Sequence, residues 1–286
     1  MAIIPEQAAV LITGCSTGIG RAVAVYLAKK SFTVFAGVRK DRDAETIRQL
    51  GLPTLLPICP LDLTQSEHTR KAVLGVEKEI KARGLNGLNA LVNNAGGGFI
   101  APVELIDVKK FRQELETRVL GSLDLVQKTL PLLRRGGGRV VWIMTPAIIP
   151  TPYVAGIHAC DFAVNCLART LDIELKPWGI PQIMIRCGGI KTGAVSSSAD
   201  DLEESVRTWP RERFLPYKPL LFRWREEMDR FDAKRTEPEE VAEVVFKALC
   251  SRFPRRRYSV GYMARAAAFL EFFPQAWADF ILKIRF

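Results

Sequence analysis

A glycine-rich segment near the start of the chain has the residue types and spacing of a phosphate-binding turn. Residues 13–20 read Thr-Gly-Cys-Ser-Thr-Gly-Ile-Gly and lie between an apolar run and a segment with helical spacing. Glycines let the backbone approach a pyrophosphate, and the first N–H groups of the following helix carry partial positive charge. In this setting the motif predicts a dinucleotide-binding site, with a turn that binds nothing as the alternative. The predicted contacts come from Gly14, Ser16, Thr17, Gly18, Ile19 and Gly20.

The residues that follow the second apolar run, Phe32–Val38, distinguish between the two nicotinamide cofactors. An acidic side chain there would accept hydrogen bonds from the adenosine ribose and favour NAD. This sequence instead has Arg39 and Lys40, with Ser16 in the facing turn. Two cations and a hydroxyl suit a 2′-phosphate, so the predicted cofactor is NADP(H). An Arg39 that merely faces solvent is the alternative.

Apolar runs alternate with segments of helical spacing along the whole chain, without a linker or an internal repeat. Strands are predicted at residues 8–12, 32–38, 55–58, 90–92, 139–144, 182–186 and 258–261. Helices are predicted at 21–30, 66–82, 107–133 and 156–176, and a further one begins at Thr236 as N-cap, with Glu239 three residues on. The repetition of strand, helix and strand predicts a doubly wound parallel sheet with helices on both faces. The expected fold is α/β, a single-domain Rossmann fold over residues 1–286.

Four motifs resemble those of the short-chain dehydrogenase/reductase family: the turn at 13–20, Asp62-Leu63, residues 93–96 (Asn-Asn-Ala-Gly), and residues 187–192 (Cys-Gly-Gly-Ile-Lys-Thr). The family usually has Pro where Cys187 stands. The resemblance covers nearly the whole chain and is greatest for the branch of 17β-hydroxysteroid, retinol and 3-hydroxybutyrate dehydrogenases. It implies that Asp62 and Leu63 bracket the adenine. It also implies cofactor contacts from Asn93, Ala95, Gly96, Gly188, Ile190 and Thr192, the last two at the nicotinamide carboxamide.

The catalytic residues of that family do not stand at the matching positions. The family usually has an Asn, a Ser and a Tyr-x-x-x-Lys pair, in which the Tyr exchanges a proton with the carbonyl oxygen. Here Arg118 matches the Asn, Thr145 matches the Ser, and Ile157 and Asp161 match the Tyr and the Lys. Without a donor the developing alkoxide is poorly stabilised. Ordinary alcohol–ketone interconversion is therefore not expected.

Three classes of function remain open. The first, which we predict, is an atypical NADPH-dependent reductase. Its acceptor is either an iminium ion, which Asp161 would stabilise by its charge, or a conjugated alkene, whose enolate Arg118 or His158 would stabilise. The second is a redox-neutral cyclase or isomerase with Asp161 or His158 as acid or base. The third is a non-catalytic NADP-binding protein in which Arg118 and Asp161 fill the old site as a buried ion pair. Such a pair is compatible with all three classes.

The other candidate residues each have an alternative role. Thr145 keeps a hydroxyl for a substrate oxygen, or it caps a strand end. His158 lies beside the Tyr position but about 100° around the helix from Ile157, which favours a bystander. Tyr153 precedes the helix and is a candidate replacement proton donor. Asp161, one turn after Ile157, is the first catalytic candidate.

Two C-terminal segments are rich in aromatic residues. The segment at about 193–235 lies where the related family has its substrate lid, and it predicts either a flap over a bulky apolar substrate or a packing element. The stretch at about 264–286 is predicted as one hydrophobic helix that packs on the core, forms a dimer contact or touches a membrane surface. The family resemblance implies a homodimer or homotetramer.

Composition excludes several other classes. The chain has 286 residues and a formal net charge of +10, which a polyanionic cofactor and a solvated surface explain without a nucleic-acid partner. The six cysteines lack metal-ligand spacing, so no metal site is predicted. No apolar run reaches the roughly 18 residues that a membrane-spanning helix needs. The glycine turn follows so soon after Met1 that we expect no signal peptide and a cytoplasmic location.

Overall fold

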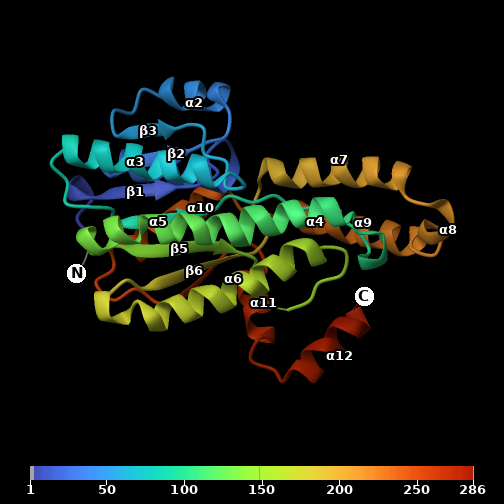
Figure 1. Cartoon of the computed structure of the whole chain (residues 1–286). Coiled ribbons are helices and arrows are strands. Elements are labelled where there is room, and N and C mark those ends of the chain that lie inside the picture. Colours follow the sequence, from blue (N-terminus) through green and yellow to red (C-terminus); the bar gives the residue numbers. More distant parts are fainter. Residues whose placement is uncertain (1–2, 148, 286) are drawn as a thin grey trace.

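The structure is a computed structural model that describes residues 3–147 and 149–285, of which 194–199 and 285 are described by their backbone alone. Seven strands form one parallel sheet in the order β3-β2-β1-β4-β5-β6-β7 (Figure 1). The expected doubly wound α/β fold is confirmed. The strands are β1 (Ala9–Ile12), β2 (Thr33–Gly37), β3 (Leu55–Ile58), β4 (Ala90–Asn93), β5 (Arg139–Met144), β6 (Gln182–Cys187) and β7 (Arg257–Val260).

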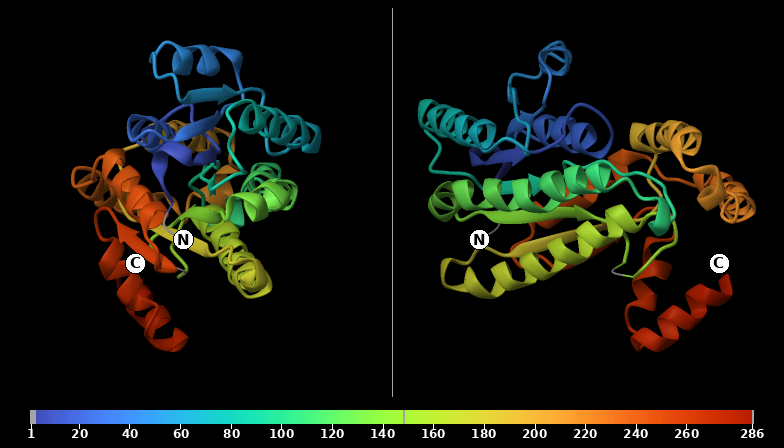
Figure 2. Two further views of the ribbon diagram at one scale, coloured as in Figure 1. Left: turned by 90° about the vertical axis from the view of Figure 1, so that its left-hand side faces the viewer. Right: turned by 45° about the vertical axis from the view of Figure 1, so that its right-hand side comes forward.

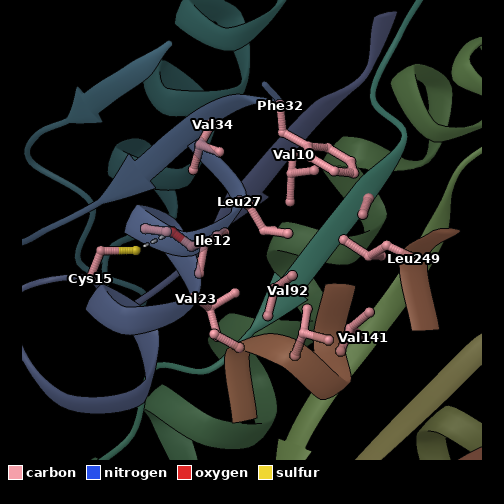
Figure 3. Close-up of a cluster of buried hydrophobic side chains, with 14 of the residues drawn as sticks. Val10, Ile12, Cys15, Val23, Leu27, Phe32, Val34, Val92, Val141 and Leu249 are labelled. Atoms are coloured by element: carbon pink, nitrogen blue, oxygen red, sulfur yellow. Dashed lines mark hydrogen bonds between the residues drawn. The ribbon is translucent and has the colours of Figure 1, made fainter. Parts of the chain in front are cut away.

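Helices cover both faces of the sheet, because the strands at its centre are buried on both sides. On one face, side chains of β1, β2 and β4 pack with α1 (Gly18–Lys29), α2 (Asp41–Arg48) and α10 (Pro238–Cys250); Figure 3 shows part of this cluster. On the other face, the strands pack with α3 (Ser66–Ala82), α5 (Gly121–Gly136) and α6 (Ala155–Glu174). Short 3₁₀ turns occur at Pro5–Gln7, Val103–Leu105 and Lys176–Trp178.

The order of the strands places the site. The chain moves outward from β1 through β2 to β3 and then returns to β4 on the other side of β1. Helices on the two sides therefore diverge at the carboxyl ends of β1 and β4, and in open α/β sheets the ligand crevice forms at this switch point.

One predicted helix is interrupted where sequence periodicity indicated a continuous one. Within the predicted helix at 107–133, α4 (Val108–Leu115) passes into a π-helical segment, Glu116–Leu120, before α5 begins. A π-helical turn contains one residue more than an α-helical turn, because its hydrogen bonds join residues i and i+5, and it is frequent at functional sites. Here it carries Arg118 into the interior.

Two predicted boundaries are wrong. Thr236 is not a helix N-cap, because it lies in extended backbone that bridges Ile190, and its N–H donates to the Gly189 carbonyl. The helix α10 begins at Pro238 instead. The C-terminal stretch is not one helix but two, α11 (Ala264–Leu270) and α12 (Gln275–Arg285), because Pro274 lies between them. Residue 286 lies outside the described residues.

Three helices occupy the segment predicted as a lid, namely α7 (Gly193–Thr208), α8 (Arg211–Phe214) and α9 (Lys218–Asp232). They extend beyond the carboxyl edge of the sheet, and the α11–α12 pair projects from the body below them (Figures 1 and 2). Within the described part of the chain, no helix is both long enough and apolar enough to cross a bilayer.

Candidate active site

The glycine turn leaves bare backbone at the carboxyl end of β1. Gly14 has a φ of +71°, a conformation that side chains rarely adopt. A Cβ on Gly20 would lie 2.3 Å from the Gly14 carbonyl oxygen, so the start of α1 packs directly on the turn. Only glycine permits this approach, which directs the first N–H groups of α1 toward the crevice.

Asn94 and Thr13 join this turn to the end of β4. The Asn94 side-chain amide donates to the carbonyls of Thr13 and Gly14 at 2.9 and 3.2 Å. The Thr13 hydroxyl accepts from the N–H groups of Asn94 and Ala95 at 3.0 and 2.9 Å. Asn94 was not among the predicted site residues. Its adjacency to Asn93 in a motif after a buried strand was the available signal.

A cavity of about 1030 Å³ runs from the glycine turn to the lid helices. Its wall includes thirteen of the fifteen predicted cofactor residues: Gly14, Ser16, Thr17, Gly18, Ile19, Arg39, Asp62, Leu63, Ala95, Gly96, Gly188, Ile190 and Thr192. The two others support the wall from behind. Gly20 lies under the turn, and Asn93 is buried with an amide that has no hydrogen-bond partner within the described residues.

Charged groups mark the adenosine end of the cavity. Arg39 is exposed at its rim and lowers the pKa of Asp62 through its charge. Burial by itself would raise the pKa of Asp62, but hydrogen bonds from the Thr64 N–H and hydroxyl reverse that effect, and the net pKa lies below its ordinary value. Asp62 is therefore an anion held by Thr64 beside an exposed cation.

Arg118 makes three polar contacts at the opposite end of the cavity. Its Nε donates to Glu114 Oε2 at 3.1 Å, its Nη1 lies 3.5 Å from Asp161 Oδ1, and its Nη2 donates to the Gly97 carbonyl at 2.6 Å. The guanidinium also covers Gly96, where a Cβ would lie 2.7 Å from Cζ. Arg118 and Glu114 both line the cavity. The predicted Arg118–Asp161 contact is thus present, with a second carboxylate that sequence analysis missed.

Glu114 could have been found from spacing alone. It precedes Arg118 by four residues, the separation at which an acid and a base on a helix meet. Both side chains are mostly buried, with 14% and 17% exposed. A partly buried cation that faces two carboxylates and a carbonyl is well compensated.

Asp161 lies behind the cavity wall and does not line it. Its side chain is 3% exposed, and Oδ2 accepts a hydrogen bond of 2.7 Å from the Thr145 N–H at the end of β5. Thr145 does line the cavity, and its hydroxyl donates weakly to the Ala147 carbonyl at 3.4 Å. The structure therefore brings Arg118 and Thr145 to the cavity and places Asp161 in the layer beneath them.

Ile157 lines the cavity, at the position predicted from the family motifs for the tyrosine. Its Cδ1 packs so closely on Gly98 that a Cβ there would lie 2.3 Å away. His158, the next residue, turns aside: its Nδ1 donates to the Ile149 carbonyl at 2.8 Å, and burial lowers its pKa. Neither His158 nor Asp161 is among the residues that line the cavity.

Tyr153 also lies outside the wall. Its backbone has a φ of +66°, its carbonyl accepts from the Ala101 N–H at 2.8 Å, and its ring meets Trp224 of α9 edge-on, with centroids 5.7 Å apart. Burial raises the pKa of its hydroxyl. In this arrangement Tyr153 connects the loop before α6 to the lid rather than presenting its hydroxyl to the cavity.

Polar contacts join the helices of the segment predicted as a lid to each other and to α4. Lys110 of α4 lies 3.9 Å from Asp201 of α7, and Arg225 of α9 pairs with Glu203 of α7 at 3.3 Å. The lid contributes Leu202, Trp224 and Met228 to the cavity wall, opposite Phe99 and Ile157. Cys187 is a further wall residue, and burial raises the pKa of its thiol to about 12. This thiol is neutral near pH 7 and is no nucleophile.

A sequence model of the short chain dehydrogenase family matches residues 8–203. The chain belongs to this family. Short-chain dehydrogenase PC-15 of Penicillium crustosum is 37% identical to it over 189 residues, which cover 65% of this chain and 67% of that protein. Estradiol 17-beta-dehydrogenase 2 of Rattus norvegicus is 29% identical over 97% of this chain and 74% of its own length. Retinol dehydrogenase 16 of Homo sapiens is 29% identical over 90% of this chain and 81% of its own length.

Solved structures agree with this assignment at the level of the fold. A short-chain dehydrogenase from Burkholderia cenocepacia in complex with NADP superposes with a TM-score of 0.74 at 21% identity, over 98% of this chain and 99% of that one. A short-chain dehydrogenase from Streptomyces avermitilis gives a TM-score of 0.73 at 20% identity, over 92% and 91% of the two chains. The chain is therefore a member of an NAD(P)-binding oxidoreductase family, with its own set of residues around Arg118.

Proposed function

We propose that this protein is an NADPH-dependent reductase of a bulky apolar substrate whose acceptor is a conjugated alkene. The observation that carries the proposal is the pairing of Ile157 with Arg118. An aliphatic side chain lines the cavity where the family has its acid, and a guanidinium lines it nearby. Among the described residues, none of those that line this cavity is a tyrosine.

The residues of the adenosine end fit NADP(H). A side chain at Gly20 would collide with the turn, and the first N–H groups of α1 suit a pyrophosphate. Arg39 is exposed at the rim beside Ser16, where a cation and a hydroxyl suit a 2′-phosphate. When bound, NADPH supplies a hydride to the acceptor.

The chemistry of a conjugated acceptor suits the groups at the other end. Hydride addition to the β-carbon of an enone leaves an enolate whose charge lies mainly on oxygen, and the α-carbon then takes a proton from solvent. Arg118 uses three of its five N–H groups for Glu114, Asp161 and Gly97, which leaves two for that oxygen. Thr145 lines the same cavity, and in this proposal its hydroxyl exchanges the weak bond to the Ala147 carbonyl for one to the ground-state carbonyl of the substrate. A fixed donor for a developing charge is the main requirement of this step.

An iminium acceptor is less well supported by the same geometry. It would depend on Asp161 to stabilise a cation in the cavity, but this carboxylate lies behind the wall and is bonded to Arg118 and Thr145. An extended apolar substrate agrees with the cavity walls of Ile157, Phe99 and Trp224. It also agrees with the steroid and retinoid dehydrogenases among the relatives.

The test is NADPH oxidation by a panel of cyclic enones and the matching saturated ketones. We expect turnover with enones only, and a loss of about a hundredfold in kcat for Arg118→Met, with NADPH affinity unchanged. Arg112→Met is the matched control, since Arg112 is an exposed residue of the same helix. Equal reduction of the saturated ketones would overturn the proposal. Conversion of a substrate without net NADPH consumption would instead establish the redox-neutral alternative.

A further inference from the structure

The two C-terminal helices present a row of large apolar side chains to solvent. Phe272 is 85% exposed and Trp277 is 62% exposed, and the row continues along α12 at intervals of three and four residues. This spacing puts the α12 members on one side of the helix. We call the set the C-terminal apolar face: Phe269, Phe272, Phe273, Trp277, Phe280, Ile281 and Ile284.

The fold holds this face away from the core. Ala278 is buried, so α12 turns its small side chain inward and its aromatic side outward. Both views of Figure 2 show α12 projecting from the α/β body. Contiguous exposed apolar patches of this kind are uncommon on proteins that act alone in water, and they mark contact surfaces.

Cations border the face, and the acids near it are occupied or partly buried. Arg265 of α11 and Lys283 of α12 are exposed, and Lys234 lies over the Tyr262 ring just before α11. Glu271 is held by Arg257 at 2.8 Å and by the buried Arg186 at 3.5 Å. The remaining acid, Asp279, is half-buried.

We propose that the C-terminal apolar face lies on an anionic phospholipid bilayer, parallel to its surface. A helix of eleven residues is too short to cross a bilayer, but its aromatic side can enter the boundary between headgroups and acyl chains. The bordering Arg265 and Lys283 then meet lipid phosphates. A second copy of this chain fits the C-terminal apolar face less well. A two-fold contact would bring Arg265 and Lys283 of the two copies together, and each copy has a net charge of +10.

Contacts just before α11 connect the C-terminal apolar face to α9 of the predicted lid. The Tyr262 ring packs on Phe231 of α9 with centroids 5.1 Å apart, and α9 lines the cavity through Trp224 and Met228. The Glu271 ion pairs fix the end of α11 on β6 and on the edge strand β7. A protein bound in this way would hold its cavity close to the layer in which an apolar substrate dissolves.

The first test measures co-sedimentation with vesicles of phosphatidylcholine and phosphatidylserine, and with vesicles of phosphatidylcholine alone, without any acceptor. The test variant is Trp277→Ser with Phe280→Ser and Ile284→Ser. The control is Leu74→Ser with Ile173→Ser and Phe253→Ser, which removes equally exposed apolar groups elsewhere. We expect binding to the anionic vesicles to fall at least tenfold in the test variant and to be unchanged in the control.

Other outcomes overturn the proposal. Equal binding to both kinds of vesicle would exclude an anionic surface, and no binding by the intact protein would exclude any bilayer. If the test variant binds vesicles as the intact protein does but sediments as a smaller particle in their absence, the face is an interface between copies. The circular dichroism spectrum of each variant shows whether its fold is intact. Because no step uses an acceptor, these results do not depend on the proposed reaction.

A second test locates the face by fluorescence. Brominated acyl chains quench tryptophans that enter the bilayer, and Trp277 and Trp178 are similarly exposed, at 62% and 51%. We expect Trp277→Phe to abolish most of the quenching and Trp178→Phe to leave it. Retained quenching in Trp277→Phe would place another surface at the membrane.

Discussion

Arg118 and Asp161 face each other beneath the cavity, with Nη1 of the arginine 3.5 Å from Oδ1 of the aspartate. The resemblance to the family predicts that they stand where it usually has an asparagine and a lysine. On that prediction, the cation of the site lies on the π-helical segment instead of α6, and a carboxylate on α6 faces it. Glu114 is a second carboxylate partner of the same guanidinium.

The ion pair should be measurable as stability. Asp161→Asn keeps an acceptor for the Thr145 N–H but leaves Arg118 with Glu114 as its one carboxylate partner. We expect the free energy of unfolding to fall by about 1–3 kcal/mol. Urea denaturation of this variant, of Arg118→Met and of the double variant forms the test. Additive single effects, within about 0.5 kcal/mol, would show that the two side chains do not interact.

Cofactor preference should depend on Arg39. Arg39→Ala removes the cation beside the predicted 2′-phosphate, and we expect NADPH affinity to fall about tenfold or more while NADH affinity is maintained. Calorimetric titration with both cofactors measures this directly. Arg42→Ala is the control, because Arg42 is a largely exposed arginine three residues further on. An equal loss of NADH affinity would mean that Arg39 does not bind the 2′-phosphate of NADPH.

The missing proton-transfer pair should be restorable. The triple variant Arg118→Asn, Ile157→Tyr and Asp161→Lys replaces the ion pair and the aliphatic wall by the groups usual in the family. We expect reduction of saturated ketones to appear in this variant, and enone reduction to fall with the loss of Arg118. Ile157→Phe is the steric control, since it adds a ring against Gly98 without a hydroxyl. Ketone turnover by the control as well would assign the gain to shape rather than to proton transfer.

Acid should destabilise the protein through His158. Burial lowers the pKa of this imidazole below 6.5, its ordinary value, so below pH 6.5 the unfolded chain takes up a proton that the folded one refuses. Stability is therefore lost as the pH falls from about 6.5 toward the depressed pKa. His158→Gln should flatten that part of the curve of unfolding free energy against pH. His68→Gln, which removes the other histidine of the chain, is the control; an equal flattening there would contradict the assignment.

The sheet was predictable because buried parallel strands are continuous apolar runs, and the glycine turn because its neighbours are a strand and a helix. The helix α2 was missed since only Ala44 and Ile47 in it are buried, which is too few for a helical pattern. The π-helical segment was missed because apolar spacing on either side of Glu116–Leu120 fits a continuous helix. Thr236 has the sequence features of an N-cap, but tertiary pairing with Ile190 takes precedence.

The site was only partly predictable for a physical reason. Alignment with family motifs gives the position of a residue along a helix but not the layer in which its side chain ends. Asp161 and Ile157 share one side of α6, yet Ile157 forms the wall and Asp161 the layer beneath. The homo-oligomer and the cytoplasmic location stay predictions.

The π-helical segment also sets how this site can change by insertion and deletion. A π-helical turn accommodates one residue more than an α-helical turn at the same point. Deletion of one residue within Glu116–Leu120 would let α4 and α5 join as a regular helix with their faces kept, because the wider turn is what takes up the extra residue. Lys110 and Glu114 would keep their side of the helix, but Arg118 would lose the turn that carries it between Glu114 and Asp161. Loss of a single codon here would therefore remodel the substrate end without unfolding the protein.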